Sequence, residues 1–186
     1  EAGTLSEDVV EAITENRFTP ARKLFWRNSL LQFGTTKALI SSLEKHTENE
    51  WLTRVRESED LGALKSLVAD AEIQARASDG VSVRLLWDVC QIPDFRSISN
   101  SEHADLLGTI YNYLHEKGQI PQEWLAQQIN RIDKTTGDID ALSKRLAYIR
   151  TWTYVSQRKD WLEDQSHWRD ETRAVEDRLS DALHVA

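Results

Sequence analysis

The sequence predicts an all-α protein, an irregular multi-helix bundle of about eight helices that can divide into two small lobes. Three observations support this fold class. Apolar residues recur at three- and four-residue spacing along most of the chain. Breaks are sparse, because the 186 residues include only seven glycines and three prolines. Most segments between these breaks open with a Ser, Thr or Asp of the kind that caps a helix N-terminus.

Four helices are expected in the first lobe, residues 1–80. A capping box predicts the start of the first helix. Thr19 followed by a proline opens the second, and a glycine ends it. Thr35 or Thr36 can cap the third helix, and Ser58 opens a fourth that continues without a break to an Asp-Gly pair. The expected ranges are 4–13, 21–33, 36–43 and 58–79.

The second lobe, residues 81–186, begins with an ambiguous segment. Residues 81–89 alternate apolar and polar side chains as a strand does, and the same residues also fit a short buried helix. We favour the helix, because no partner strand is obvious elsewhere and a lone strand cannot satisfy its backbone.

Four further helices are expected after this segment. A capping box at Ser99, a helix-initiating Pro121 and an Asp138 cap mark three of the starts. The helix behind Asp138 is the clearest, and the last helix follows an interruption at Lys159-Asp160. The apolar side of the clearest helix is expected to contain Ile139, Leu142, Leu146, Ile149 and Thr153.

Composition narrows the function classes. The chain holds 23 Lys and Arg against 31 Asp and Glu, a formal net charge of −8, which excludes a strongly basic nucleic-acid module as a description of the whole chain. No transmembrane run and no signal peptide is visible, and Cys90 is the single cysteine, so we expect no membrane contact and a reducing, cytoplasmic setting. The missing initiator methionine, and a helical pattern that continues to Ala186, suggest a piece of a longer protein.

No catalytic residue, metal site or cofactor site is predicted. A phosphate-binding loop needs G-x-x-x-x-G-K-[ST], whose glycines let backbone N–H groups surround the phosphates, and no such run exists. The five histidines are far apart and lack the close spacing that metal sites use. Cys90 lies in an apolar stretch and is expected to be a buried, inert thiol.

The most suggestive side chains lie on the helix behind Asp138. Arg150, Tyr154 and Arg158 follow one another at i, i+4 and i+8, so they form one row along the flank of the apolar side. Such a row can hold a phosphate backbone and stack a base. The alternative is that Tyr154 packs while the arginines pair with nearby acids, such as those at positions 160 and 163.

A second candidate for nucleic-acid contact lies near the N-terminus. Arg22 and Arg27, with Lys23 between them, flank the aromatic pair Phe25 and Trp26. The same two interpretations apply, because surface arginines often only solvate a helix.

Several stretches taken together resemble one known family. They are Pro20–Leu31 (PARKLFWRNSLL), Val83–Phe95 (VRLLWDVCQIPDF), Gly137–Leu142 (GDIDAL), Ile149–Val155 (IRTWTYV), Asp160–Leu162 (DWL) and Arg173–His184 (RAVEDRLSDALH). This combination resembles the C-terminal region of the mitochondrial degradosome RNA helicase family, specifically its bacterial relatives. The resemblance covers nearly the whole chain.

The resemblance implies a helical accessory domain that buttresses two RecA-like motor domains and lines the RNA path. It implies that ATP and Mg²⁺ belong to the motor, that the whole protein acts in RNA degradation, and that an exoribonuclease is a partner. No catalytic residue carries over, because none of the family's helicase motifs occurs in this stretch. A rival hypothesis is an adaptor domain that docks a nuclease or another RNA-decay partner, since the acidic balance and seven tryptophans also suit a protein interface.

Overall fold

The computed structural model describes residues 24–45, 52–54 and 58–186. Helices build most of this part, which confirms the predicted all-α bundle of about eight helices. The helices are α2 (Thr36–Leu43), α3 (Glu59–Val68), α4 (Ala71–Arg76), α5 (Gly80–Cys90), α6 (Asn100–Lys117), α7 (Gln122–Ile132), α8 (Ile139–Ser156) and α9 (Gln165–Val185). Two three-residue strands, β1 (Leu24–Trp26) and β2 (Leu52–Arg54), pair in parallel.

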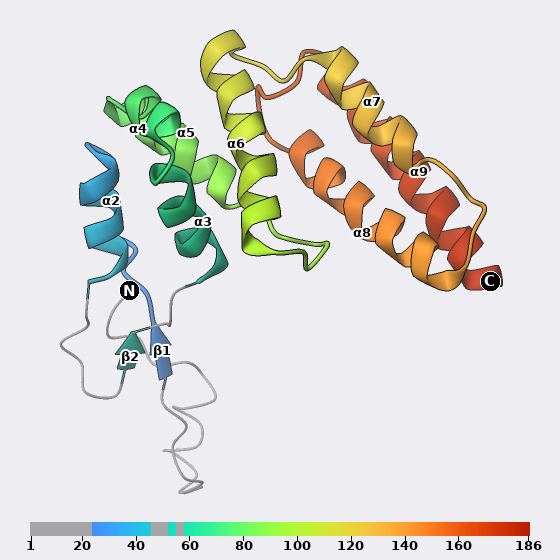
Figure 1. The fold of residues 1–186 in the computed structure, drawn as a ribbon, viewed down its shortest axis with the longest axis horizontal. Coiled ribbons are helices and arrows are strands. Elements are labelled where there is room, and N and C mark those ends of the chain that lie inside the picture. Colours follow the sequence, from blue (N-terminus) through green and yellow to red (C-terminus); the bar gives the residue numbers. More distant parts are fainter. Residues whose placement is uncertain (1–23, 46–51, 55–57) are drawn as a thin grey trace, which may run out of the picture.

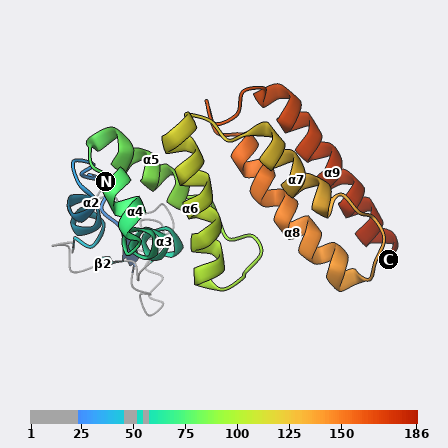
Figure 2. The same ribbon diagram turned by 45° about the horizontal axis from the view of Figure 1, so that its top comes forward.

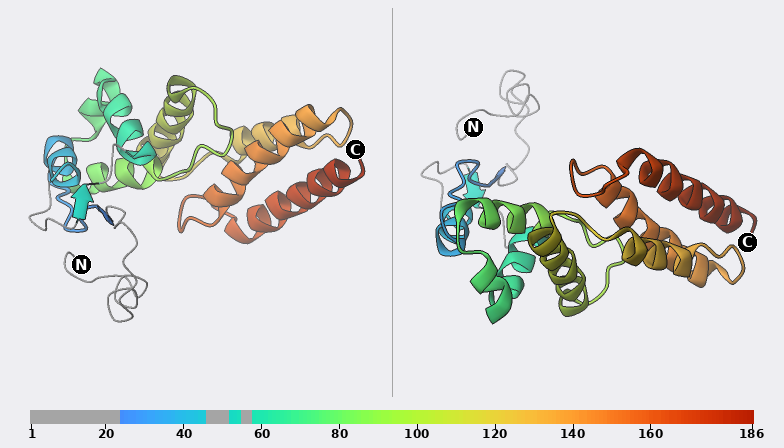
Figure 3. Two further views of the ribbon diagram at one scale, coloured as in Figure 1. Left: turned by 90° about the horizontal axis from the view of Figure 1, so that it is seen from below. Right: turned by 90° about the horizontal axis from the view of Figure 1, so that it is seen from above.

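The described helices pack in two groups (Figure 1). In the first group α3 packs against α2, α4, α5 and α6, and in the second α7 and α9 pack against α8. The long antiparallel pair α8 and α9 lies apart from α2–α5 in each view (Figures 2 and 3). The expected lobe boundary at residue 80 therefore runs through the first group, and the packing partners change between α6 and α7 instead.

A continuous apolar core joins the helices. Trp152 on α8 and Tyr111 on α6 are among the largest fully buried side chains. The Trp152 ring meets the Trp124 ring of α7 edge to face, with ring centroids 5.4 Å apart. Burying a large apolar side chain stabilises a fold by about 1.5–3 kcal/mol, so these rings contribute strongly to the packing of α7 on α8. No described helix is both long and apolar enough to cross a bilayer.

Four of the predicted helix starts are confirmed, three of them by a capping side chain. The side chains of Thr35, Ser99 and Asp138 each accept a hydrogen bond from a backbone N–H in the first turn, at 2.8–3.2 Å. Pro121 immediately precedes α7. The end of α6 is also as expected, because Gly118 adopts the left-handed conformation (φ 77°) that a residue with a Cβ reaches only with strain.

The helix predicted over residues 21–33 is wrong where the structure describes it. Residues 24–26 form β1, and residues 27–33 are not helical. Leu-Phe-Trp suits a strand, and pairing with β2 gives its backbone hydrogen-bond partners. Beyond the strand, the Asn28 amide donates to the carbonyls of Leu30 and Ser42 and holds the segment against α2. The helix predicted at 4–13, and residues 21–23, lie outside the described residues.

The single helix predicted over residues 58–79 is also wrong, since α3 and α4 are separate. Asp70 lies between them with an extended backbone, and its carboxylate accepts hydrogen bonds from the N–H groups of Glu72 and Ile73. A cap at this position starts a new helix instead of continuing the old one. The helix favoured at residues 81–89 is confirmed as α5, which Asp79 caps.

The apolar side predicted for α8 needs one correction. Leu142, Leu146 and Ile149 are buried, whereas Ile139 in the first turn is 58% exposed. Helix α8 has neighbours on two sides, α7 and α9. Its buried surface therefore widens towards the C-terminal half to include Trp152, which the predicted stripe omitted.

Candidate functional site

The predicted row is helical only as far as Tyr154, because α8 ends at Ser156 and Arg158 lies in the segment between α8 and α9. Its arginines contact neighbouring helices. The Nε of Arg150 lies 3.5 Å from a carboxylate oxygen of Glu176 on α9. The hydroxyl of Thr153 donates to the other oxygen of the same carboxylate at 3.1 Å. Tyr154 is half-buried and packs against the core. Arg150 therefore faces an acid that can neutralise its charge.

Arg158, at the end of the row, connects the two helix groups. Its Nη2 lies 3.5 Å from Oδ1 of Asp88 on α5, and its guanidinium lies 5.1 Å from the Trp161 ring centre. Close by, the N–H of Ile120 donates to the carbonyl of Trp161 at 2.9 Å. The pairing of the row's arginines matches the alternative interpretation, but the acids come from α5 and α9 and not from positions 160 and 163.

The second predicted site is only partly described. Arg22 lies outside the described residues. Arg27 donates from Nη1 to Oδ2 of Asp60 at 3.0 Å, and its guanidinium lies 5.1 Å from the Trp87 ring centre. This arginine therefore holds the segment after β1 against α3 and α5.

A basic groove lies elsewhere on the same helix group as the row. It encloses about 310 Å³ between the loop after α5, the end of α7 and the first half of α8. We name it the Tyr148 groove; its lining residues are Arg96, Ile98, Ile132, Lys144, Arg145 and Tyr148. Three of the six side chains are cationic and the other three are apolar or aromatic.

Arg96 lies directly over the aromatic ring of the groove. Its guanidinium carbon is 4.0 Å from the Tyr148 ring centre, a cation–π contact. No residue in the described part of the chain forms an ion pair with Arg96. Burial raises the pKa of Tyr148, and the positive charges of Arg96 and Arg131 oppose that rise. The phenol therefore stays neutral at physiological pH, and it donates to Oε1 of Gln128 at 3.3 Å.

Arg145 is held in the groove by carbonyl groups. Its Nη1 donates to the carbonyl oxygens of Lys134 (2.8 Å) and Thr136 in the loop between α7 and α8. The loop approaches closely at Gly137, which has φ 131°. Carbonyls orient a guanidinium and leave its positive charge in place. Lys144 differs, because it pairs with Asp140 one turn away at 2.9 Å.

These contacts define what the groove can bind. Arg96 and Arg145 offer guanidinium donors that no described carboxylate neutralises, and the Tyr148 ring and two isoleucines offer apolar surface beside them. A ligand with an anionic group next to a flat or apolar group matches this arrangement. Sequence reasoning missed the groove, because Arg96 and Arg145 are separated by α6 and α7 and share no local spacing.

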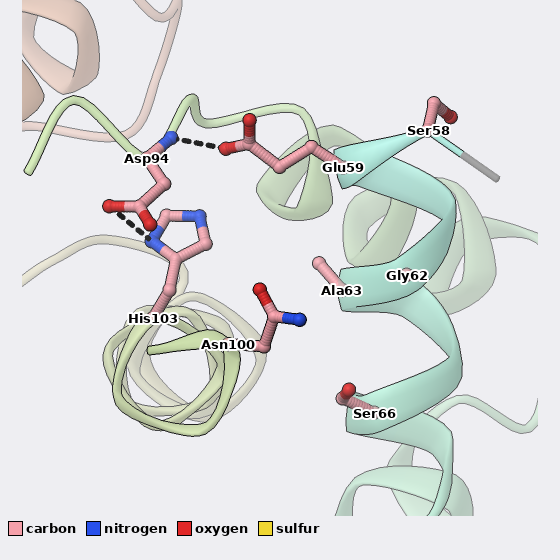
Figure 4. A pocket seen from close by; sticks show the side chains of 8 residues that line it. All are labelled: Ser58, Glu59, Gly62, Ala63, Ser66, Asp94, Asn100 and His103. Atoms are coloured by element: carbon pink, nitrogen blue, oxygen red, sulfur yellow. Dashed lines mark hydrogen bonds and ion pairs between the residues drawn. The ribbon is translucent and has the colours of Figure 1, made fainter. Parts of the chain in front are cut away.

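A second hollow, of about 270 Å³, lies between α3, the loop after α5 and the start of α6 (Figure 4). Its lining is polar and includes the carboxylates of Glu59 and Asp94 and the imidazole of His103. No group of three or more His, Cys, Asp or Glu suited to a metal ion occurs within residues 24–45, 52–54 and 58–186. Cys90 is buried as predicted, and burial raises the pKa of its thiol, which disfavours the reactive thiolate.

Comparisons of the chain with protein-family models, with curated proteins and with solved structures find no match. The resemblance to the helicase family therefore rests on the sequence stretches quoted above.

Proposed function

We propose that this chain is a helical accessory domain of an ATP-dependent RNA helicase, and that the Tyr148 groove contacts the RNA. In this proposal the domain buttresses the RecA-like motor domains, which bind ATP and Mg²⁺ and carry out the hydrolysis. The domain itself performs no catalysis. Action in the cytoplasm and cooperation with an exoribonuclease belong to the same proposal.

One observation carries the proposal: in a chain of net charge −8, two arginines that pair with no carboxylate of the described residues line a groove with an aromatic ring. Arginine planes bind phosphate oxygens through paired N–H donors, and aromatic rings stack bases. Positive charge gathered in one hollow of an acidic protein directs a polyanion to that hollow and away from the rest of the surface.

The proposal places the RNA contact in the groove and not in the Arg150–Tyr154–Arg158 row. In the row, Glu176 and Asp88 each lie 3.5 Å from an arginine nitrogen. A phosphate would have to displace these carboxylates. At Arg96 and Arg145 it would meet donors whose partners, within the described part of the chain, are a ring and carbonyl oxygens. The apolar and aromatic residues that line the groove add a surface for a base.

The test compares two double variants with the same change of charge. The affinity of the full chain for a fluorescently labelled single-stranded oligouridine is measured by anisotropy at several salt concentrations. We expect Arg96→Ala/Arg145→Ala to weaken binding by about tenfold or more, and to reduce the salt slope by about 1.4 if both arginines contact phosphates. Circular dichroism checks that both variants are folded.

Arg150→Ala/Arg158→Ala is the matched control, and we expect it to change the affinity by less than about twofold. Equal losses in the two double variants would show that only the total charge matters and would reject the groove. If neither the chain nor its variants bind RNA, the adaptor hypothesis replaces this one, and the search turns to protein partners.

A further inference from the structure

Arg96 lies on a loop that polar residues of two helices, α3 and α6, hold on the side away from the Tyr148 groove. The loop runs from residue 91 to residue 99, between α5 and α6. Its Arg96 side chain extends to α8, and its Asp94 backs onto the polar hollow between α3 and α6 (Figure 4). The hollow and the Tyr148 groove thus share one loop.

Two hydrogen bonds attach this loop to its neighbours just before Arg96. The N–H of Asp94 donates to Oε1 of Glu59 in the first turn of α3. His103 on α6, only 5% exposed, lies with Nε2 3.1 Å from the carbonyl oxygen of Ile92. A carbonyl oxygen only accepts, so Nε2 is the donor. The other ring nitrogen, Nδ1, lies 4.0 Å from Oδ1 of Asp94.

The backbone on both sides of Arg96 is bent into a defined turn. The N–H of Ser97 donates to the carbonyl of Asp94 at 3.2 Å, which encloses Arg96 within the turn. Ser97 adopts φ 51°, in the left-handed region. A residue with a Cβ is held there at a cost of about 1 kcal/mol, which surrounding contacts must offset. Within the described residues, the hydrogen bonds of Glu59 and His103 are the ones that side chains make to the backbone of this loop.

We infer that Glu59, Asp94 and His103 form a positioning cluster that holds the 94–97 turn so that Arg96 lies on the Tyr148 ring. The cluster makes no contact with the groove's ligand and acts through Arg96. Its importance for RNA binding rests on the function proposed above. Its effect on the contact between Arg96 and Tyr148 does not depend on any ligand.

The first experiment observes that contact without RNA. The ring resonances of Tyr148 are recorded by NMR on the full chain with labelled tyrosine, and Tyr148→Phe identifies them. Arg96→Ala removes the guanidinium, and the resulting change in the Tyr148 chemical shift is the reference for complete loss of the contact. We expect Glu59→Ala to move the Tyr148 resonance in the same direction by about half of that change.

Glu59→Gln should restore the wild-type resonance, because an amide oxygen also accepts the bond from the Asp94 N–H. Glu123→Ala is the matched control, since Glu123 is likewise an exposed glutamate in the first turn of a helix. An unchanged Tyr148 resonance in Glu59→Ala overturns the inference. So does a change that glutamine fails to reverse, or one that the Glu123 control reproduces.

The second experiment is a double-mutant cycle in oligouridine affinity. We expect Glu59→Ala to weaken binding about threefold in the wild-type background and to have no effect in the Arg96→Ala background. Equal losses in both backgrounds overturn the inference, because Glu59 would then act independently of Arg96. If Arg96→Ala leaves the affinity unchanged while the resonances move as expected, the proposed function fails and the positioning of Arg96 stands.

Discussion

Two sets of arginines lie on α8 and in the segments beside it, and their surroundings differ. In the Arg150–Tyr154–Arg158 row, each arginine meets a carboxylate from another helix. In the Tyr148 groove, Arg145 meets backbone carbonyls and Arg96 meets the face of a ring. Arg145 and Arg150, the members of the two sets that lie on α8, are five positions apart, which is less than two helical turns. The comparison shows that the neighbours of a helix, and not the spacing of its own residues, decide which arginines keep an unneutralised charge.

The neighbours differ because of what packs on each part of α8. The second half of α8 faces α9, which supplies Glu176, and the segment after α8 meets the end of α5, which supplies Asp88. Its first half faces two loops, residues 133–138 and 91–99, which supply carbonyls and a further arginine. Loops expose backbone acceptors that helices use internally. The groove is therefore a consequence of where the loops lie.

The largest expected effect, on the free energy of unfolding, comes from truncating a core side chain of α8 that lies between the two sets of arginines. Ile149 is fully buried between them on α8, so Ile149→Ala should lower the free energy of unfolding by about 2–5 kcal/mol. Chemical denaturation followed by circular dichroism measures this. Ile139→Ala is the control on the same helix, and because Ile139 is 58% exposed the cost should stay below about 0.5 kcal/mol. Similar costs for the two variants would contradict the assigned inner face of α8.

A smaller effect, on RNA affinity, is expected when the negative charge that pairs with Arg150 is removed. Glu176→Gln keeps an acceptor for Thr153 and removes the negative charge beside Arg150. If pairing keeps Arg150 from binding RNA, this variant should bind oligouridine about two- to threefold more tightly in the anisotropy assay. Asp177→Asn changes the net charge equally at an exposed neighbouring position on α9. The same gain in this control would attribute the effect to net charge alone.

The smallest expected effect concerns the pH dependence of the contact between Asp88 on α5 and Arg158 in the segment after α8. Burial raises the pKa of Asp88 above 3.8, and the attraction of Arg158 and Arg84 only partly offsets it. The folded protein therefore holds this proton to a higher pH than the unfolded chain does. The group adds stability below its unfolded pKa, and that stability is lost as the pH rises through the raised pKa.

Asp88→Asn should remove this component of the pH dependence and change the free energy of unfolding at neutral pH by less than about 0.5 kcal/mol. Urea denaturation of both proteins from mildly acidic to neutral pH is the measurement. A marked loss of stability in Asp88→Asn at neutral pH would show that the Arg158 ion pair outweighs the burial of the carboxylate. Arg158 would then contribute to the stability of the fold through this ion pair.

The helices that the sequence predicted correctly are those with local signals. The capping residues Thr35, Ser99 and Asp138 and the terminating Gly118 act within one turn of their own position, so their effect is visible in the sequence. The strand at residues 24–26 was mistaken for a helix because its partner, residues 52–54, is distant in the sequence. The break at Asp70 was missed although its cap is local, because the apolar spacing continues through it.

The sequence by itself determined the helical class, most helix boundaries and the side of α8 on which Arg150 and Tyr154 lie, whereas Arg158 lies beyond the end of that helix. Periodicity and capping are short-range, so a linear pattern contains them. Tertiary structure alone decided that this row is paired and that Arg96, Arg145 and Tyr148 share one groove. The physical reason is that neutralisation of a charge depends on which groups lie within a few ångströms, and here those groups come from segments that are far apart in the chain.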